Sequence, residues 1–472
     1  MDAIKCDVLV IGAGSGGLSF AAGASQMGAD VVLLEGHKMG GDCLNYGCVP
    51  SKALLASGHM AHAQGHGAAY GLADASPQVD YAGVKDHVQG VIDTIAPVDS
   101  QERFEGFCVR VIREMGKFVS DREVEAGNYR ITARRIVIAT GSHAFVPPIK
   151  GLADVDYLTN ETLWALCDQP KHLLIIGGGP IGMEMAQAHR RLGSEVTVIE
   201  ADKALGRDDP EAASIVIDAM RGEGITIREK TFADEVRQEG DEIIVETRDG
   251  DAIRGSHLLV AVGRAPNTQG LDLSRAGIET TPQGIMVDAS LRTSNSRVYA
   301  IGDVAGQGQF THMAGYHAGV IIRSILFGLP AKAKTAHIPR ATYTDPELAQ
   351  VGLTEAEART AHGDALEIAR FDYSHNDRAI ATRQTRGFIK VMVVKGRPVG
   401  ATIVGHQAGE LIATWSLAIA NRLKMGQIAG MVAPYPTIAE LSKRVAGAYF
   451  TPRLFESERV KRVVRFVQKW LP

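Results

Sequence analysis

Residues 7–17 read Asp7-Val-Leu-Val-Ile-Gly12-Ala-Gly14-Ser-Gly-Gly17, and this stretch decides the first part of the fold. It predicts a short apolar strand, a G-x-G-x-x-G turn and the start of a helix, an arrangement that binds dinucleotides. Gly12 allows the tight turn, Gly14 lets the backbone approach a pyrophosphate, and Gly17 lets the helix pack closely on the strand. Glu35 lies 23 positions after Gly12, at the end of the next predicted strand. A carboxylate there can accept hydrogen bonds from an adenosine ribose.

The same pattern occurs a second time, in Leu173-Leu-Ile-Ile-Gly177-Gly-Gly179-Pro-Ile-Gly182. Glu200 again lies 23 positions after the first glycine of its turn. One such turn is weak evidence, but two copies with the same spacing predict two dinucleotide sites, which we interpret as FAD and NAD(P)H. The carboxylate of Glu200 would repel a 2′-phosphate, so we expect NAD(H) to be preferred over NADP(H).

Three further strand ends carry small or polar residues of the kind that meet a cofactor at the edge of a parallel sheet. They are residues 135–141, 258–263 with the following Arg264-Ala-Pro-Asn267, and 297–303. After about residue 336 the nucleotide patterns stop, and we expect strands over 342–352, 387–394 and 401–404 and a helix over 410–423. We predict an α/β protein with two Rossmann-like domains. The FAD-binding domain is divided between 1–147 and 264–335, the NAD-binding domain spans 148–263, and a separate α+β domain spans 336–472.

The composition is that of a globular enzyme. The 472 residues include 50 Lys and Arg against 54 Asp and Glu, which gives a formal net charge of −4 and argues against a nucleic-acid-binding protein. Five cysteines in so long a chain exclude a secreted disulfide scaffold. We find no signal-peptide pattern and no apolar run of 18 residues, and therefore expect a cytoplasmic protein.

The segment between the first nucleotide pattern and the rest of the chain carries redox chemistry. Residues 40–52 read Gly40-Gly-Asp-Cys43-Leu-Asn-Tyr-Gly-Cys48-Val-Pro50-Ser-Lys52. Pro50 suits the first turn of a helix, which places Cys48 at its N-terminus, where the helix dipole lowers a thiol pKa. Lys52 lies on the same helical face and adds positive charge. The isolated cysteines are expected only to fill space in the core, and they are Cys6, Cys108 and Cys167.

Cys-x4-Cys followed by Val-Pro-Ser-Lys, with two nucleotide patterns and Gly302-Asp303, resembles the class I pyridine nucleotide–disulfide oxidoreductases. This family includes dihydrolipoamide dehydrogenase, glutathione reductase and mercuric reductase. The resemblance covers essentially the whole chain. It implies a homodimeric flavoenzyme whose last domain, residues 336–472, forms the dimer interface.

The resemblance also implies roles for individual residues. Cys48 would pair with the flavin, Cys43 would exchange with the substrate, and Lys52 would lie near the flavin N5 and pair with Glu184. The FAD-binding residues would further include Gly41, Gly116, Thr140, Gly141, Asp303 and Thr311, and Gly263 would lie at a cofactor as well. Electrons would pass from nicotinamide to flavin, then to the Cys43–Cys48 disulfide, and then to the substrate.

The chain departs from the disulfide reductases of the family in its C-terminal motif. Those enzymes have His-Pro-Thr-x-x-Glu, whereas this chain has Tyr435-Pro-Thr-Ile-Ala-Glu440. A phenol with an ordinary pKa of ~10 is a poor base at neutral pH, where imidazole at ~6.5 is well matched. We therefore expect poor turnover of lipoamide or glutathione disulfide. His312 and His317 are weaker candidates for the base, because both belong to a helix on the FAD side.

Tyr435 resembles the residue at this position in mercuric reductases, which hold a soft metal ion between thiolates and need no proton relay. A soft metal ion or a small molecule is therefore the expected electron acceptor, and no bound metal is predicted. No cysteine follows Cys167, so the C-terminal cysteine pair of mercuric reductases is missing. Asp42 replaces a usual threonine and is expected to raise the pKa of Cys43. Dihydrolipoamide dehydrogenase remains an alternative.

Residues 458–471 predict an amphipathic helix with a basic face. Val460, Val463, Val464, Val467 and Leu471 share one face, and five Lys and Arg residues occupy the rest. We expect this helix to pack on its own protein. The alternative is peripheral contact with an anionic membrane, as in a membrane-surface NADH:quinone-type or redox-sensing flavoprotein.

Overall fold

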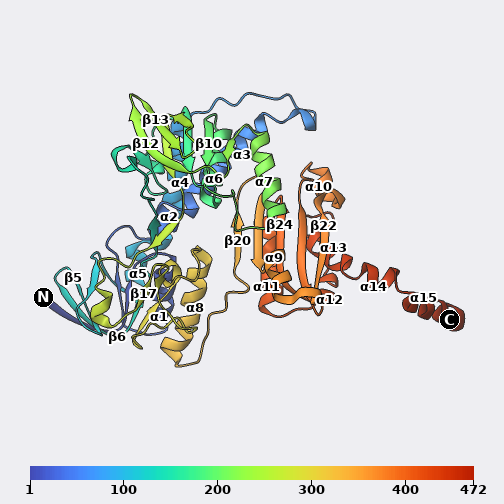
Figure 1. The fold of residues 1–472 in the computed structure, drawn as a ribbon. Helices are drawn as coiled ribbons and strands as arrows, with labels where there is room; N and C mark the ends of the chain where they lie inside the picture. Colours follow the sequence, from blue (N-terminus) through green and yellow to red (C-terminus); the bar gives the residue numbers. More distant parts are fainter. Residues whose placement is uncertain (472) are drawn as a thin grey trace. The chain divides into compact units, whose positions relative to one another are not determined.

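The computed structural model describes residues 1–471, and the chain divides into two compact units. The first unit contains Met1–Ala201 and Arg228–Lys334, and the second contains Asp202–Ile227 and the residues from Thr335 onward. Figure 1 shows the elements of both units along the chain. No helix in the described part of the chain is long and apolar enough to cross a membrane.

The first unit is built around a largely parallel sheet with the strand order β3-β2-β1-β6-β5-β4, in which β19 also pairs with β6. These strands span Arg110–Ile112 (β3), Val31–Leu34 (β2), Asp2–Ile11 (β1), Tyr129–Ile138 (β6), Glu123–Ala126 (β5), Gly116–Phe118 (β4) and Val298–Ala300 (β19). The last four side chains of β1, residues 8–11, and all four of β2 are apolar and buried, as expected for strands that are covered on both faces.

The register of this sheet aligns the carboxyl ends of its central strands. Ile11 lies opposite both Leu34 and Ile138, and Ala300 also lies opposite Ile138. The residues that follow these four strands therefore meet at one edge of the sheet. Helices α1 (Ser15–Gln26) and α8 (Thr311–Phe327) are neighbours on one face (Figure 1), where a Cβ atom on Gly16 would lie 3.3 Å from the Cβ atom of Ala314.

A second parallel sheet in the same unit contains β10, β9, β15 and β8 in that order. They span Glu195–Ile199 (β10), His172–Ile176 (β9), His257–Val260 (β15) and Tyr157–Leu158 (β8). Ile176 lies opposite both Ile199 and Val260, so the carboxyl ends align here too. An antiparallel sheet of β12 (Ala233–Glu239), β13 (Glu242–Thr247) and β14 (Ala252–Gly255) follows.

Two long helices connect these sheets within the first unit. Helix α3 (Cys48–Gln64) packs against α6 (Pro180–Arg191), and a Cβ atom on Gly58 would lie 3.3 Å from the carbonyl oxygen of Ala188. Helix α4 (Tyr81–Ile95) lies next to α3. The redox segment and the second nucleotide pattern are therefore joined through helix packing.

The second unit contains an antiparallel sheet with the order β20-β21-β24-β23-β22. The strands span Pro339–Thr342 (β20), Glu347–Gly352 (β21), Arg397–Gly405 (β24), Phe388–Val394 (β23) and Leu366–Asp372 (β22). Strand β22 was not among the expected elements, and the expected helix over 410–423 is α11 (Ala408–Ala420), which buries Trp415 in the core.

Helix α7 (Pro210–Gly222) belongs to this second unit, although it lies within the sequence range predicted for the NAD-binding domain. The ammonium group of Lys390 on β23 is buried between Asp209 at 2.8 Å and Glu355 at 2.9 Å. These ion pairs tie the start of α7 to the sheet. The boundaries predicted for the FAD-binding, NAD-binding and C-terminal domains remain a prediction.

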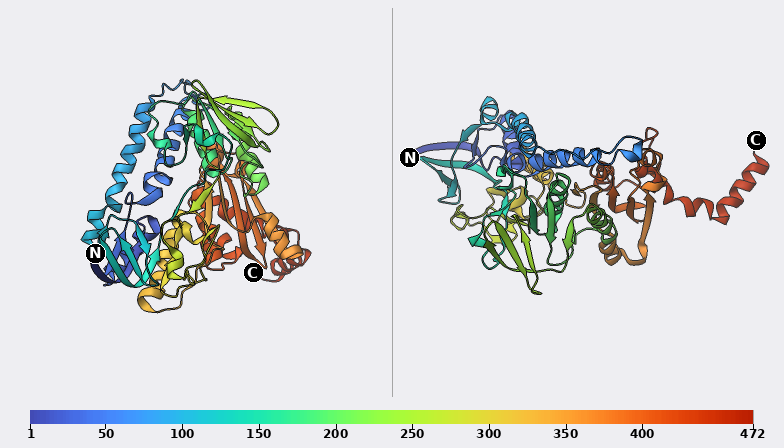
Figure 2. Two further views of the ribbon diagram at one scale, coloured as in Figure 1. Left: turned by 60° about the vertical axis from the view of Figure 1, so that its left-hand side comes forward. Right: turned by 90° about the horizontal axis from the view of Figure 1, so that it is seen from above.

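The C-terminal helices are α13 (Glu440–Ala448), α14 (Thr451–Phe455) and α15 (Glu458–Trp470). Figure 2 shows α14 and α15 extending from the rest of the second unit. None of the residues of α15 is buried. The expectation that this helix packs on its own protein is therefore wrong, because its apolar side chains contribute to no core.

Candidate active site

The first glycine turn lies between β1 and α1, at the aligned edge of the larger sheet. Gly12 has a φ of +105°, and a Cβ atom there would lie 2.5 Å from the carbonyl oxygen of Ala139. A Cβ atom on Gly17 would lie 1.9 Å from the carbonyl oxygen of Gly12. Both positions therefore require glycine, whereas a Cβ atom on Gly14 would meet only the Cα atom of Gly41, at 3.9 Å. The space beside Gly14 lets a pyrophosphate approach the backbone.

Glu35 holds this turn from the end of β2. Its carboxylate accepts hydrogen bonds from the backbone N–H groups of Ala13, at 2.8 Å, and His37, at 2.7 Å. A carboxylate can accept about four hydrogen bonds. Glu35 can therefore also accept from ribose hydroxyl groups, as its place in the pattern predicts.

The second glycine turn repeats this geometry between β9 and α6. Gly177 has a φ of +112°, and a Cβ atom on Gly182 would lie 2.0 Å from the carbonyl oxygen of Gly177. A Cβ atom on Gly179 would have no other atom within 4 Å. Glu200 accepts a hydrogen bond of 2.6 Å from the backbone N–H of Gly178. Both turns thus fit a dinucleotide, with open backbone at the start of a helix and a carboxylate at the following strand end.

The two cysteines of the redox segment lie on two consecutive helices, a short one followed by a long one. Cys43 is on α2 (Gly41–Asn45), and Cys48 is the first residue of α3, as Pro50 predicts. Both are free thiols, and a hydrogen bond joins their side chains. The sulfur of Cys48 also lies 3.3 Å from the hydroxyl oxygen of Thr311, the first residue of α8.

The hydrogen bond between the cysteines moves their two pKa values apart. The pKa of Cys48 is lowered to about 6, first because Cys43 donates to it and then, against the effect of burial, because of Thr311 and Lys52. The same hydrogen bond raises the pKa of Cys43, and burial raises it further. Near neutral pH the pair is therefore a Cys48 thiolate next to a Cys43 thiol.

Lys52 links helix α3, which begins at Cys48, to helix α6, which follows the second glycine turn. It lies one turn after Cys48 on α3, and its ammonium group is 2.8 Å from Glu184 Oε2 on α6. Glu184 is buried, with 6% of its side chain exposed, whereas 38% of the Lys52 side chain is exposed. A buried carboxylate thus fixes the ammonium group that contributes to the low pKa of Cys48.

The carboxylate of Asp42, next to Cys43, has two partners that were not predicted from the sequence. Its Oδ1 atom lies 3.0 Å from Arg264 Nη2 and accepts a hydrogen bond of 3.0 Å from Asn160. Asp42 contributes to the raised pKa of Cys43, as expected, but this contribution is small beside that of the hydrogen bond to Cys48. The segment Arg264-Ala-Pro-Asn267, at the end of a predicted strand, was the only sequence signal for the arginine.

Asp303 lies at the same edge of the sheet, after β19. It accepts a hydrogen bond of 2.6 Å from the Ser142 hydroxyl, and its Oδ2 atom is 4.0 Å from Arg264 Nε. Burial raises the pKa of Asp303, and the bond from Ser142 and the charge of Arg264 oppose this effect. Arg264 therefore lies between two carboxylates, those of Asp42 and Asp303.

The remaining predicted cofactor-binding residues of the first unit are Thr140, Gly141, Gly263 and Gly116. The Thr140 hydroxyl donates to the carbonyl oxygen of Asn267, at 2.7 Å, and Gly141 follows with a φ of +68°. Gly263 also has a positive φ, of +135°, and a Cβ atom there would have no other atom within 4 Å. Gly116 is buried on β4, where a Cβ atom would lie 2.7 Å from Leu34 Cδ1, so packing already explains this glycine.

Tyr435 and Glu440 both lie in the second unit, and each of them has a different partner. The Tyr435 hydroxyl donates to Asp377 Oδ2, at 2.8 Å, and this bond raises the pKa of the phenol. Glu440 is buried and pairs with Arg444 at 3.7 Å. Asp377 on α10 (Asp377–Ala381) was not predicted from the sequence.

The two histidines of α8 differ in their surroundings. His317 is fully buried and accepts a hydrogen bond from the backbone N–H of Gly302, at 3.3 Å, and burial lowers its pKa to about 4. His312 stacks on Phe310. A histidine with the pKa of His317 is uncharged near neutral pH and is a poor general acid.

The isolated cysteines do not share one role. Cys6 is buried in the core of the larger sheet, as expected. Cys108 and Cys167 are exposed, so the expectation that they fill core space is wrong. Within residues 1–471, no group of three or more His, Cys, Asp or Glu side chains could hold a metal ion.

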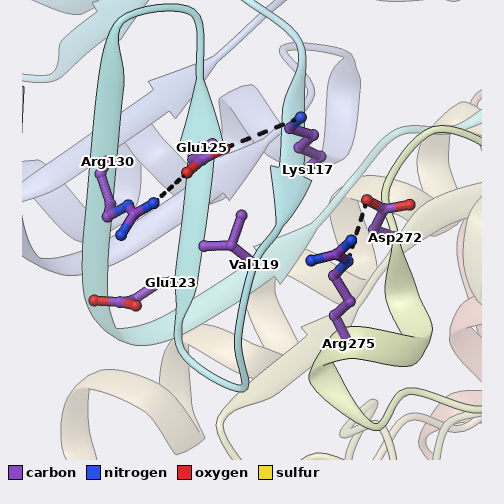
Figure 3. Close-up of a pocket in the computed structure, with 7 residues that line it drawn as sticks. All are labelled: Lys117, Val119, Glu123, Glu125, Arg130, Asp272 and Arg275. Atoms are coloured by element: carbon purple, nitrogen blue, oxygen red, sulfur yellow. Dashed lines mark hydrogen bonds and ion pairs between the residues drawn. The ribbon is translucent and has the colours of Figure 1, made fainter. Parts of the chain in front are cut away.

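Figure 3 shows a polar hollow beside β4, β5 and β6 that contains no predicted site residue. Its charged side chains pair with one another, with Arg130 2.5 Å from Glu125 and Arg275 3.6 Å from Asp272. Because these charges already neutralise each other, we place the candidate active site at the cysteines and not here.

Comparison with known proteins identifies the family. Residues 6–318 match the family model described as pyridine nucleotide-disulphide oxidoreductase, and residues 338–446 match the dimerisation domain of that family. The chain is 34% identical over 455 residues to a mercuric reductase of Streptomyces lividans, an alignment that covers 94% of this chain and 96% of the relative. It is 36% identical over 459 residues to a mercuric reductase of Shigella flexneri, with coverage of 94% and 80%.

A solved structure agrees with these matches. The Cu(II) complex of the HOCl-induced flavoprotein disulfide reductase RclA from Escherichia coli superposes with a TM-score of 0.83 at 25% identity, and the match covers 93% of this chain and 99% of that one. The predicted α/β fold and the predicted FAD and pyridine nucleotide cofactors are confirmed by these findings, and the dimerisation domain supports a homodimer. The chain is an FAD-dependent oxidoreductase that belongs to the pyridine nucleotide-disulphide oxidoreductase family.

Proposed function

We propose that this enzyme passes two electrons from NADH through FAD and the Cys43–Cys48 pair to a soft metal ion, as a homodimer in the cytoplasm. The observation that carries the proposal is the placement of Cys43 and Cys48 on adjacent helices, with Cys48 at the N-terminus of α3 and its sulfur 3.3 Å from the Thr311 hydroxyl oxygen. The pKa of Cys48, lowered to about 6 first by a hydrogen bond from Cys43, agrees with this placement. Reduction of a disulfide between these residues consumes two electrons and one proton, and yields the Cys43 thiol and the Cys48 thiolate. This is the protonation state that the structure favours near neutral pH.

Bound FAD would accept a hydride from the nicotinamide and supply its electrons to the disulfide. In this proposal Cys48 would face bound FAD, and Lys52, held by Glu184, would add positive charge beside it. Gly12, Gly14, Gly17, Glu35 and Gly41 hold the adenosine and pyrophosphate, and the residues around Asp303 hold the remainder. The latter group comprises Thr140, Gly141, Thr311 and, by family resemblance alone, Gly116, and Gly263 would lie at a cofactor as well.

The acceptor follows from the chemistry of two adjacent thiols. Soft thiolate ligands select soft metal ions, and binding by Cys43 requires only the loss of its proton. Reduction of a divalent ion to the metal would use two electrons from NADH and release one proton. The names of the mercuric reductase relatives and the Cu(II) in the related Escherichia coli structure support an ion of this class.

Tyr435 supports a metal ion over a disulfide. Its hydrogen bond to Asp377 raises the phenol pKa, so even less of this tyrosine is present as the basic phenolate at neutral pH than of an ordinary tyrosine. Tyr435 and Glu440 would contribute to the acceptor site of the partner subunit, without a proton relay. Dihydrolipoamide dehydrogenase, the alternative function, needs such a relay for the leaving thiol.

The preference for NADH is part of the proposal and rests on Glu200. Its carboxylate lies at the end of β10, fixed by the N–H of Gly178. An added 2′-phosphate would meet this negative charge, whereas two ribose hydroxyls could donate to it. Gly177, Gly179 and Gly182 complete this second site.

Anaerobic titration of the holoenzyme with NADH tests the proposal. We expect a long-wavelength absorbance from the Cys48 thiolate and the flavin, which Cys48→Ala abolishes and Cys108→Ala, the matched control, leaves unchanged. NADH-dependent reduction of Hg²⁺ to the metal, or of two Cu²⁺ ions to Cu⁺ for each NADH, should require Cys43. Equal metal reduction by wild type and Cys43→Ser, or rapid wild-type turnover of lipoamide, would contradict the proposal.

A further inference from the structure

Helix α15 lies outside the residues that match the two family models. The match to the dimerisation domain ends at residue 446, and α15 spans Glu458–Trp470. Ser457 caps its first turn by accepting a hydrogen bond from the N–H of Val460. The helix is therefore a well-formed element with its own start signal, and none of its residues is buried.

One face of α15 is apolar and lies largely in solvent. At 100° per residue, its apolar residues lie within about 160° of the helix circumference, and Arg459 in the first turn is the one charged residue in that arc. The side chains of Val463, Phe466 and Trp470 are 62%, 62% and 65% exposed. Val464 and Leu471 are also exposed, and Val460 and Val467 are half-buried. A short surface helix that exposes this much apolar area requires a partner that covers it.

The opposite face of α15 is strongly basic. Residues 458–471 contain five basic side chains and one acidic side chain, Glu458, while the whole chain has a formal net charge of −4. Lys461, Arg462, Arg465 and Lys469 lie on this face, and Arg459 lies in the first turn within the apolar arc. Within this helix, all of which the structure describes, Lys461 and Arg465 form ion pairs, and Glu458 is the partner of both. One carboxylate cannot balance five cations, so the segment keeps a large positive charge.

The combination of these two faces identifies the chemistry of the partner. Anionic lipid headgroups neutralise Lys and Arg side chains, and the interface beneath them accepts the apolar arc and the Trp470 ring. A second copy of the helix would cover the apolar arc but would bring ten basic residues together, because each copy carries five. We propose that α15 is a peripheral anchor that binds this enzyme to an anionic membrane surface.

This inference is independent of the redox function, because α15 carries no residue of the cysteine pair or of either nucleotide turn. It implies that the enzyme works next to a lipid surface. A helix of 13 residues is about 20 Å long, which suits a position parallel to the bilayer plane.

Co-sedimentation of the full-length holoenzyme with vesicles tests the anchor. We expect binding to phosphatidylcholine vesicles that contain phosphatidylglycerol, and little binding to phosphatidylcholine alone. High salt should weaken binding because it screens the headgroup charge. Arg462→Gln combined with Arg465→Gln should weaken the partition coefficient about tenfold or more, since each basic residue near the surface contributes favourably.

Two single substitutions separate the apolar face from the charge. Val463→Asp and Gln468→Asp each add one negative charge to exposed positions of α15, but only Val463→Asp places it in the apolar arc. We expect Val463→Asp to lose binding by at least about tenfold relative to Gln468→Asp. Circular dichroism and NADH-dependent flavin reduction should be unchanged in both variants.

Three results would overturn the inference. The first is failure of the wild type to bind anionic vesicles at low salt, and the second is equal binding by Val463→Asp and Gln468→Asp. The third is a smaller oligomer for Val463→Asp in sedimentation velocity without vesicles, which would identify a second copy of the chain as the partner. None of these results bears on the metal-reductase activity, so the two proposals fail separately.

Discussion

Arg264 and Asp42 form an ion pair of 3.0 Å directly beside the redox cysteines. Arg264 is almost buried, with 11% of its side chain exposed, and it also donates to the hydroxyl and the carbonyl oxygen of Ser142. Ser142 therefore fixes the position of the guanidinium group independently of Asp42. The guanidinium group compensates the negative charge of Asp42 next to the redox cysteines.

The ion pair predicts opposite effects for its two members. Asp42 raises the pKa of Cys48, so Asp42→Asn should lower it, whereas Arg264→Gln should raise it by removing the cation that faces Asp42. The double variant should lie close to the wild type. The pH dependence of thiolate alkylation by iodoacetamide measures all three. Identical shifts in both single variants would mean that the pair acts through folding and not through charge.

Acidification should remove the Cys48 thiolate. The pKa of Cys48 is lowered from an ordinary value near 9 to about 6, so the thiolate is present above that pH and is lost as the pH falls through it. Cys43→Ala should move this transition to higher pH, because the hydrogen bond from Cys43 is the largest cause of the low pKa. The long-wavelength absorbance of the reduced holoenzyme, followed against pH, measures the transition. Cys167→Ala should leave it in place.

Removal of the Lys52 ammonium should destabilise the fold. Lys52→Met takes this cation away from the buried Glu184 carboxylate, and we expect a loss of about 1–3 kcal/mol in the free energy of unfolding. Lys52→Arg should lose less, and adding Glu184→Gln to Lys52→Met should restore part of the loss. Denaturant unfolding with a constant m-value provides the measurement. No loss in Lys52→Met would contradict the pairing.

Tyr435→His should improve disulfide reduction. An imidazole is matched to neutral pH, and general acid–base catalysis contributes about 10²–10⁴-fold, so a gain of about tenfold or more in lipoamide or glutathione disulfide turnover is expected. Tyr435→Phe is the matched control and should give no gain. If Tyr435→His also gives none, the acceptor pocket does not admit a disulfide substrate.

The choice of nicotinamide should depend on the charge of Glu200. Glu200→Gln keeps an acceptor for the Gly178 N–H but removes the negative charge. We expect it to narrow the ratio of kcat/KM for NADH to that for NADPH by about tenfold. Glu195→Gln, at the exposed start of the same strand, is the control and should leave the ratio unchanged. A wild-type preference for NADPH would refute the interpretation of Glu200.

The sequence alone predicts site residues at positions where the backbone conformation permits only one residue type. Gly12 and Gly17 are necessary because any Cβ atom would collide with a carbonyl oxygen, and such local constraints are visible as a motif. The partners of Asp42 and Tyr435 were not predictable in this way. Asp377 is 58 positions before Tyr435, and only the folded chain places the two side chains together.

The C-terminal helix shows a different limit. An amphipathic pattern states that an apolar face will be covered, but it does not state by what. The same residues, Val463 to Leu471, would suit a protein core or a membrane surface. The structure shows that these side chains are not buried in the described chain, which no pattern in the sequence could show.

The tethering of Glu35 and Glu200 has a consequence for the order of assembly. Each carboxylate is bound to an N–H group of the glycine turn that it serves, Ala13 in one case and Gly178 in the other. The rotamer freedom of these side chains is therefore lost when the protein folds and not when a cofactor arrives. Both carboxylates are therefore positioned before a nucleotide binds. Nucleotide binding would require little further ordering of these side chains, and the entropy cost of such ordering would not reduce the affinity.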